Sequence, residues 1–257
     1  MVSVGPLARS ISDLRLALRI IAGADQDLWE TPSVPLEPVE VTRPRVAWTD
    51  GFGGCPVTTD TRKALSALAG NLERAGWIVD RATPDLNFER VWETWGQVLW
   101  CEVGSTMPPE AEAAEVQRLA GRCDDAFSRG VASCEGATMR QFTAAMTARD
   151  RFIAPLDRFF EKYDALLCPV TVGPAIRHCA PGTPVPVDDR SVTYLMGGLA
   201  YTAPFNLIGN PVVVLPMGRS AEGLPLGVQV AGRRWDDMRV LAVAEAIDRL
   251  QPPIRLA

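Results

Sequence analysis

The sequence is poor in the side chains that most often carry acid–base and metal chemistry. Its 257 residues include one histidine, His178, and two lysines, Lys63 and Lys162, and no two of its six cysteines form a CxxC pair. These residues cannot assemble a common zinc-ligand set, so we expect neither a metal nor a cofactor. Six cysteines are also too few for a disulfide scaffold in a chain of this length. We therefore expect free, mostly buried thiols, none of them catalytic.

Long apolar runs and an excess of positive charge are absent as well. No segment approaches the ~18 consecutive apolar residues of a membrane-spanning helix, and Met1–Pro6 lacks the basic and apolar regions of a signal peptide. The 26 basic residues are outnumbered by 31 acidic ones, for a formal charge of −5. Such a balance argues against a dedicated nucleic-acid surface. We expect a cytoplasmic protein with no nucleic-acid or membrane partner.

What is present is the composition of a globular protein, with 47% hydrophobic and 22% charged residues. Arg45–Trp48 has the apolar character of a short buried strand. A helix follows from about Thr59 to Ala75, with three leucines on one face, and Trp77–Val79 then continues as a strand. A strand–helix–strand unit of this kind favours an α/β architecture.

The remaining pattern extends this α/β prediction to a mixed sheet with helices on both faces. Further strands are predicted at Ala165–Pro169, Val212–Leu215 and Leu226–Val230, the last two as an antiparallel hairpin. The first helix carries an apolar stripe of Leu7, Ile11, Leu14, Leu18 and Ile21. A capping box at Thr138 and Gln141 begins a helical region that Pro155 must kink or divide. A last helix is predicted after Asp236. Between the helices and strands, a proline-rich linker is predicted at about 31–44 and an irregular loop at about 173–190.

Three segments, taken together, resemble one known family. Residues 5–14 read GPLARSISDL, residues 163–171 read YDALLCPVT, and residues 201–211 read YTAPFNLIGNP and run on to GLPLGVQVAG at 223–232. Their order and spacing are similar to those of the amidase signature hydrolases over nearly the whole chain, with the middle only loosely patterned. On this resemblance, residues 1–257 are the C-terminal portion of a single amidase domain with a partial amidase signature fold.

The resemblance implies hydrolysis of a carboxylic amide to an acid and an amine or ammonia. Family members use a Ser–cis-Ser–Lys triad on a segment of the G-G-S-S-G-G type. A serine hydroxyl attacks only when a base accepts its proton, and a lysine is such a base only when desolvation keeps its amine neutral. Backbone amides of the same segment form the oxyanion hole.

This chain departs from the family at that catalytic segment. Its two Gly-Gly pairs, Gly53–Gly54 and Gly197–Gly198, are followed by cysteine and leucine rather than serine. Lys63 lies off the apolar stripe of its helix, and Lys162 lies at the charged end before a strand. The family's triad also lies upstream of the GPLARS stretch, which here begins at residue 5. We therefore expect no catalytic residue in this chain, and we expect apolar surface and open strand edges where the missing half would pack.

The substrate-binding candidates lie around the third segment, because this loop is near the active site in related amidases. They are Tyr201, Thr202 and Asn206, together with Leu199. An equally supported interpretation makes the stretch a helix-to-strand connection in which Asn206 satisfies backbone groups. Glutamine-specific relatives carry an aspartate three residues before the threonine, where this chain has Leu199. The resemblance therefore argues against a free amino-acid amide as substrate.

Two other candidate sites have a structural interpretation that is stronger than the functional one. His178 and Cys179 could form a thiol–imidazole pair, but adjacent residues usually project differently and this loop offers no obvious orienting carboxylate. Trp92 and Trp95 could line a substrate pocket, but an aromatic pair on an apolar helix is more often part of a core.

Two hypotheses of function remain. In the first, the chain supplies the substrate-facing lobe of an amide hydrolase, binds a small-molecule amide, and obtains its triad from a separate N-terminal amidase half or an oligomer partner. In the second, the chain is a catalytically inactive, truncated or degenerate amidase domain that acts only as a binding partner or has no activity. An upstream in-frame G-G-S-S-G-G segment would distinguish the first from the second.

Overall fold

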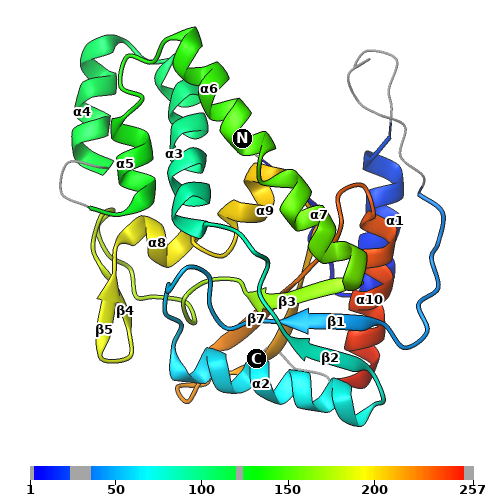
Figure 1. Ribbon diagram of the computed structural model, residues 1–257. Helices are drawn as coiled ribbons and strands as arrows, with labels where there is room; N and C mark the ends of the chain where they lie inside the picture. The colour runs from blue at the N-terminus through cyan, green and yellow to red at the C-terminus, as the bar shows by residue number, and fades with distance from the viewer. Residues whose placement is uncertain (1–2, 24–35, 120–123, 252–257) are drawn as a thin grey trace.

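The computed structural model describes residues 3–23, 36–119 and 124–251, which fold around one five-stranded sheet (Figure 1). The strand order is β2-β1-β3-β7-β6. The strands are β1 (Arg45–Trp48), β2 (Ile78–Arg81), β3 (Ala165–Pro169), β6 (Val212–Arg219) and β7 (Pro225–Ala231). β1 is parallel to β2 and to β3, whereas β7 is antiparallel to β3 and to β6. The predicted mixed sheet is confirmed.

Helices cover both faces of this sheet, as predicted. In Figure 1, α1 and α10 lie side by side at the right, α2 runs below the sheet, and α3 to α6 stand together at the upper left. The bounds of the helices are α1 (Ile11–Ile21), α2 (Thr59–Arg74), α3 (Phe88–Gly104), α4 (Pro109–Leu119), α5 (Ala126–Ala132), α6 (Met139–Asp150), α7 (Ile153–Lys162), α8 (Tyr194–Leu199), α9 (Ala203–Ile208) and α10 (Asp237–Leu250).

Side-chain alternation along the strands produces two cores, one on each face of the sheet. Leu166 of β3 packs into the core beneath α3, α7 and α9, whereas its neighbour Leu167 packs into the core beneath α1, α2 and α10. Both are fully buried, like all of β3. A strand buried on both faces is expected to be continuously apolar, which is why this segment could be predicted as central to the sheet.

The long helical region after Thr138 is divided, but one turn before Pro155. Thr138 and Gln141 form the predicted reciprocal capping box, and α6 ends at Asp150. Pro155 lies in the first turn of the next helix, α7. Proline is tolerated there because the first amides of a helix have no partner within the helix.

The predicted apolar stripe of the first helix is only partly correct. Ser10 caps α1 by accepting a hydrogen bond from the Asp13 amide at 3.1 Å, so the helix begins at Ile11 and Leu7 lies outside it, fully exposed. Ile11 is buried, and Leu14 and Leu18 pack partly on the same core. Ile21 is exposed. The cap, rather than the apolar period, decides where the helix starts.

The irregular loop predicted at about 173–190 ends earlier in the structure than predicted. Its last residues form a hairpin of β4 (Val185–Val187) and β5 (Arg190–Val192). Val185 and Val187 are buried in the core with α3 and α9, and Asp188 adopts a positive φ of 53° in the two-residue turn. The Asp188 carboxylate accepts from the amide and hydroxyl of Thr59 at 2.9 and 2.7 Å. The prolines of this stretch obscured the alternation of its two valines.

Three further features concern the predicted linker, the edges of the sheet and membrane-spanning helices. Residues 36–44, the described part of the predicted linker, lie in neither a helix nor a strand. Among the described residues, β2 and β6 each pair with a single strand, so both are edge strands. Within the described ranges, no helix has the length and apolar character required to cross a membrane.

Candidate functional site

The predicted substrate-binding residues lie on and beneath a ridge made by α8 and α9. Leu199, Thr202 and Asn206 are half-buried and follow one another at steps of three and four residues. Leu199 ends α8, Thr202 immediately precedes α9 and Asn206 lies within α9. The stretch is therefore mostly helix rather than a simple connection, and Pro204 lies in the first turn of α9, where proline is favourable.

Tyr201 lies beneath this ridge and is fully buried. Its hydroxyl donates to the Cys55 carbonyl at 2.7 Å, and its own carbonyl accepts from Gln229 Nε2 at 2.9 Å. Gln229, on β7, also donates to the Pro169 carbonyl of β3 at 2.8 Å. Burial raises the pKa of Tyr201, so the phenol stays protonated and remains a donor. Its contacts hold the ridge against the sheet and against the turn that follows β1.

Asn206 joins three segments that are far apart in the sequence. Its Oδ1 accepts from Trp95 Nε1 of α3 at 2.9 Å, and its Nδ2 donates to Ser3 Oγ at 3.1 Å. Trp95 is held in turn by an edge-to-face contact with Phe127, with ring centroids 5.3 Å apart. Both hydrogen bonds of Asn206 go to side chains, not to backbone groups. Sequence patterns carried no signal for these partners, because they lie 111 and 203 residues away.

Thr202 presents its hydroxyl on the same ridge with a weak internal partner. The hydroxyl lies 3.4 Å from the Leu199 carbonyl, which already accepts from the Thr202 amide at 3.1 Å. A bond of that length is at the outer limit of hydrogen-bond geometry. The hydroxyl can therefore rotate toward another acceptor or donor. Leu199, beside it, adds an apolar side chain rather than a charge.

The two lysines and the histidine of the chain are exposed. Lys63 and Lys162 are both exposed, and Lys162 Nζ lies 5.0 Å from the centroid of the Tyr163 ring. An exposed ammonium lacks the desolvation that a lysine base requires. His178 and Cys179 are also exposed, in the loop that precedes β4.

The five described cysteines are free, as predicted, whereas Cys123 lies outside the described residues. Burial raises the pKa of Cys55 and that of Cys101 to about 12, and it raises the pKa of Cys168 further. These three thiols stay protonated near neutral pH, and a protonated thiol is a poor nucleophile. Within the described residues, no three His, Cys, Asp or Glu side chains gather as a metal site.

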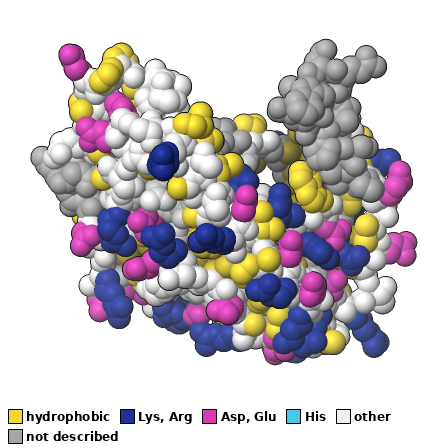
Figure 2. All heavy atoms as spheres, turned by 45° about the horizontal axis from the view of Figure 1, so that its top comes forward, with side chains coloured by type: hydrophobic (Ala, Val, Ile, Leu, Met, Phe, Trp, Pro, Cys, Tyr) yellow, Lys and Arg dark blue, Asp and Glu magenta, His cyan; other side chains and the backbone are white. Residues whose placement is uncertain are grey.

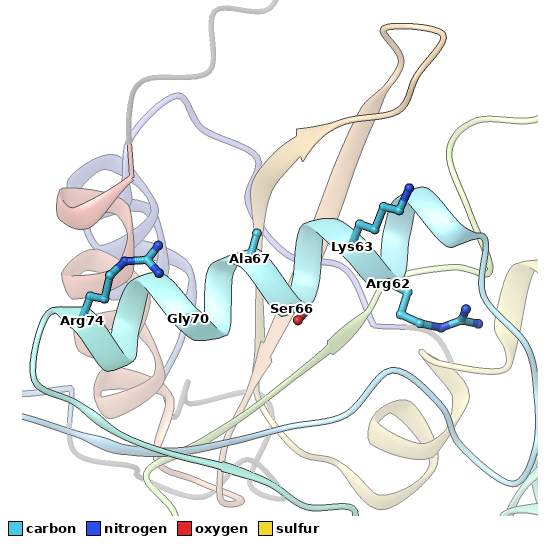
Figure 3. Close-up of a pocket in the computed structure, with 6 residues that line it drawn as sticks. All are labelled: Arg62, Lys63, Ser66, Ala67, Gly70 and Arg74. Carbon is cyan, nitrogen blue, oxygen red and sulfur yellow. The ribbon is translucent and has the colours of Figure 1, made fainter.

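A shallow groove of about 570 Å³ runs along α2 (Figure 3). Arg62 and Lys63 lie at one end and Arg74 at the other, with the small residues Ser66, Ala67 and Gly70 between them. Two of the cations already have partners, since Arg62 pairs with Asp50 at 3.2 Å and Arg74 donates to Asn71. Figure 2 shows acidic and basic side chains interspersed over the face that it displays. The groove therefore has the character of ordinary charged helix surface.

Comparison with known proteins identifies the family. The profile of the Amidase family matches residues 1–241. Indoleacetamide hydrolase of Bradyrhizobium diazoefficiens is 31% identical over 255 residues, and acylamidase of Rhodococcus erythropolis is 27% identical over 260 residues. Each alignment covers 96% of this chain, but only 46% and 52% of the respective relatives.

Solved structures agree with this assignment at the level of the fold. A bacterial aryl acylamidase of the amidase signature family superposes with a TM-score of 0.75 at 22% identity, over 96% of this chain and 53% of its own. The chain thus spans about half the length of the relatives that it matches, in their C-terminal portion. The matched profile, the shared sheet and the three sequence segments show that the chain belongs to the amidase signature family.

Proposed function

We propose that this chain is the substrate-facing half of an amide hydrolase and carries no catalytic triad of its own. The observation that carries the proposal is the family match over residues 1–241, combined with coverage of only about half of each relative. The exposed positions of Lys63 and Lys162 support it, because neither lies in the buried setting that a lysine base occupies. The serine nucleophile, its base and the oxyanion hole then come from an N-terminal half.

In this proposal the α8–α9 ridge forms one wall of the substrate site. Leu199 contributes apolar contact, Thr202 offers a hydroxyl that is weakly held within the chain, and Asn206 is fixed by its bond from Trp95. Tyr201 acts as a positioning residue from beneath, since its side chain is buried. A wall of this kind orients a neutral amide for attack without taking part in bond breaking.

The proposed substrate class is an uncharged aryl or alkyl carboxylic amide. Leu199 offers no partner to an ammonium group, and burying an unpaired charge beside it is costly. Relatives named indoleacetamide hydrolase and acylamidase are consistent with this class. One component of the glutamyl-tRNA(Gln) amidotransferase of Thermotoga maritima superposes with a TM-score of 0.70, and it is by name part of a larger assembly. In that component both halves lie on one polypeptide, since this chain covers only 52% of its length.

A chimera tests the function directly. The N-terminal portion of the Bradyrhizobium diazoefficiens indoleacetamide hydrolase, which the alignment leaves uncovered, is fused upstream of this chain and assayed with indole-3-acetamide, benzamide and glutamine. We expect turnover of the first two amides only, and no turnover by the unfused chain. Leu199→Asp should lower kcat/KM for indole-3-acetamide at least about tenfold, whereas Leu250→Asp, on the far end of α10, should not.

Three outcomes would contradict the proposal. A well-folded chimera without amidase activity would favour the alternative hypothesis of a catalytically inactive domain. Turnover by the unfused chain, with a serine labelled by a fluorophosphonate probe, would reveal a catalytic arrangement within residues 1–257. Equal losses in the Leu199→Asp and Leu250→Asp chimeras would remove the ridge from the substrate site.

A further inference from the structure

The β4–β5 hairpin is joined at its tip to the first residue of a long helix. Asp188, in the turn of the hairpin, accepts from the Thr59 amide at 2.9 Å and from the Thr59 hydroxyl at 2.7 Å. Thr59 begins α2, and the first amides of a helix have no partner within the helix. A carboxylate is favourable at this position because the start of a helix carries partial positive charge. The tip of the hairpin is therefore fixed to α2.

The first strand of the hairpin lies directly against α8 (Figure 1). A Cβ atom added at Gly197 of α8 would lie 2.6 Å from Val185 Cγ2 and 2.7 Å from Val185 Cβ. Both distances are shorter than real Cβ contacts, so the strand and the helix approach this closely only because residue 197 is glycine. At the next residue, Gly198, an added Cβ would meet no atom within 4 Å. The two adjacent glycines of α8 therefore differ, and only Gly197 is a contact point for the hairpin.

Helix α8 has two further attachments. The Gly197 carbonyl accepts from the Val172 amide at 3.5 Å, in the turn after β3. The Ala200 carbonyl, directly after α8, accepts from Nε1 of the buried Trp92 of α3 at 2.9 Å. A helix of only six residues is not stable by itself, so its place depends on such neighbours. The hairpin, the turn after β3 and α3 together hold α8.

The position of α8 sets the position of the proposed substrate wall. Leu199 is the last residue of α8, two residues after Gly197. Its carbonyl accepts from the Thr202 amide at 3.1 Å, which joins α8 to the start of α9. Any shift of α8 against the hairpin therefore moves Leu199. A misplacement of about 1 Å near a reacting group can cost roughly a hundredfold in rate.

We propose that the β4–β5 hairpin is a strap that positions α8 and thereby decides which amides fit against Leu199. This inference rests on the proposed function and adds the residues that set the substrate selectivity of the same site. Val185 fixes α8 through its contact with Gly197, and Asp188 keeps the hairpin from yielding. All three are positioning residues, because they act on the substrate only through Leu199.

The first test uses the unfused chain and needs no enzyme activity. The indole N–H resonance of Trp92, observed by NMR of the isotope-labelled chain, reports on α8 because that group donates to the Ala200 carbonyl. Gly197→Ala should shift this resonance, since α8 must move away from the fixed hairpin. Gly198→Ala, the matched control, should leave it in place because its added Cβ meets open space.

Releasing the hairpin should reverse this shift. Asp188→Gly removes the carboxylate bonded to Thr59, and glycine readily adopts the positive φ of 53° found at this position. In the double variant Gly197→Ala/Asp188→Gly the hairpin can give way instead of α8. We expect the Trp92 resonance to return toward its position in the parent.

Hydrogen exchange provides a second measurement, which also decides the matter if Gly197→Ala does not fold. Asp188 is exposed, so Asp188→Gly should fold like the parent. We expect it to raise exchange at least about threefold in the hairpin and at the Gly197 amide, because both lose their attachment to α2. Thr183→Val is the control, since it removes a hydroxyl that bonds the Ala180 carbonyl within the same loop. It should leave exchange in α8 unchanged.

The chimera with the indoleacetamide hydrolase portion then measures selectivity. The readout is the ratio of kcat/KM for indole-3-acetamide to kcat/KM for benzamide, because loss of folded enzyme lowers both values equally. Gly197→Ala should change this ratio at least about fivefold, and Gly198→Ala should leave it within about twofold. Adding Asp188→Gly to Gly197→Ala should bring the ratio back toward that of the parent.

Three results would overturn the inference. They are a folded Gly197→Ala variant with the parent's Trp92 resonance, equal shifts in the Gly197→Ala and Gly198→Ala variants, and Asp188→Gly without faster exchange in α8. The outcomes also separate this inference from the proposed function. An active chimera whose selectivity ratio does not respond to Gly197→Ala contradicts the strap alone. A Trp92 resonance that shifts in Gly197→Ala and returns in the double variant, together with an inactive parent chimera, contradicts the amidase function alone.

Discussion

The two edge strands of the sheet, β2 and β6, expose different chemistry. β2 is short and ends in Asp80 and Arg81, whereas β6 spans eight residues and begins with three valines. On β2, Asp80 pairs with Arg45 at 2.8 Å. Arg81 pairs with Asp50 at 2.7 Å and lies 5.2 Å from the centroid of the Trp48 ring. Short, charged edges resist pairing with other chains, whereas long apolar ones invite it.

The edge of β2 is suited to face water, whereas the edge of β6 is not. The Arg45 guanidinium lowers the pKa of Asp80, so the β2 carboxylate is charged throughout the physiological range. Exposed pairs of this kind contribute little to stability, so their value at an edge lies in keeping other strands away. The first half of β6 has no comparable charge in its sequence.

The largest loss of stability is expected from a substitution in β3, the central strand of the sheet. Leu167→Ala should lower the free energy of unfolding by about 2–5 kcal/mol, because it leaves a cavity in a fully buried site. Denaturation in urea measures the loss, and hydrogen exchange should rise at β2 and β6 together. Leu250→Ala, at an exposed site, should change the stability by less than about 0.5 kcal/mol. Increased exchange at one edge alone would show that the two edges do not unfold as one unit.

The next largest loss of stability is expected for Tyr201, which connects the β7 side of the sheet to the turn after β1. Tyr201→Phe removes the hydroxyl that donates to the Cys55 carbonyl and leaves that carbonyl without this donor. We expect a loss of about 1–2 kcal/mol in thermal or chemical denaturation. Thr202→Val removes a hydroxyl with only a 3.4 Å contact and should cost less than about 0.5 kcal/mol. Equal costs for the two variants would contradict the supporting role of Tyr201.

The charges of β2 provide a direct test of edge protection. Replacing them in Asp80→Val/Arg81→Val gives β2 an apolar edge like that of β6. We expect concentration-dependent self-association above that of the parent in sedimentation velocity, with little change in stability. The double variant Lys63→Val/Glu73→Val removes one charge of each sign from the exposed surface of α2 and serves as the matched control. Similar association of both double variants would show that β2 charges have no special role.

The smallest effect is expected for the ion pair that holds α1 against α10. Arg15 pairs with Glu245 of α10 at 2.6 Å and lowers the pKa of that carboxyl. A lowered pKa in the folded state stabilises above the unfolded value of about 4.3 and is lost as the pH falls through the folded value. Arg15→Ala should therefore cost about 0.5–1 kcal/mol at pH 7 and almost nothing in strong acid.

Stability measured from pH 7 down to pH 3 checks this last prediction. Arg249→Ala is the matched control, because Arg249 pairs with the same carboxylate at 2.8 Å within α10 and is more exposed than Arg15. We expect a smaller cost for it, about 0.3–0.5 kcal/mol. A cost of Arg15→Ala that does not vary with pH would indicate lost packing of the arginine stem rather than a lost ion pair.

Much of the fold could be predicted because its signals are local. The apolar run at residues 165–169, the leucine period of α2 and the Thr138–Gln141 capping box each specify an element within a few residues. The errors also have local causes. The cap at Ser10 starts α1 beyond Leu7, so Leu7 was wrongly assigned to the helix. The prolines near the β4–β5 hairpin obscured the alternation of its valines, so the hairpin was wrongly predicted as loop. The surroundings of Asn206 could not be predicted, because its partners come from α3 and from residue 3.

By itself the sequence determined the elements, the α/β class and the resemblance to amidase signature hydrolases, because periodicity, caps and motifs act over short stretches of chain. Tertiary structure alone decided which surfaces are covered. It buried Tyr201, brought Trp95 and Ser3 to Asn206, placed charged β2 and apolar β6 at opposite edges, and left one side of α1 exposed. Burial depends on contacts between residues far apart in the chain, and those contacts exist only once the sheet and its helices have packed together.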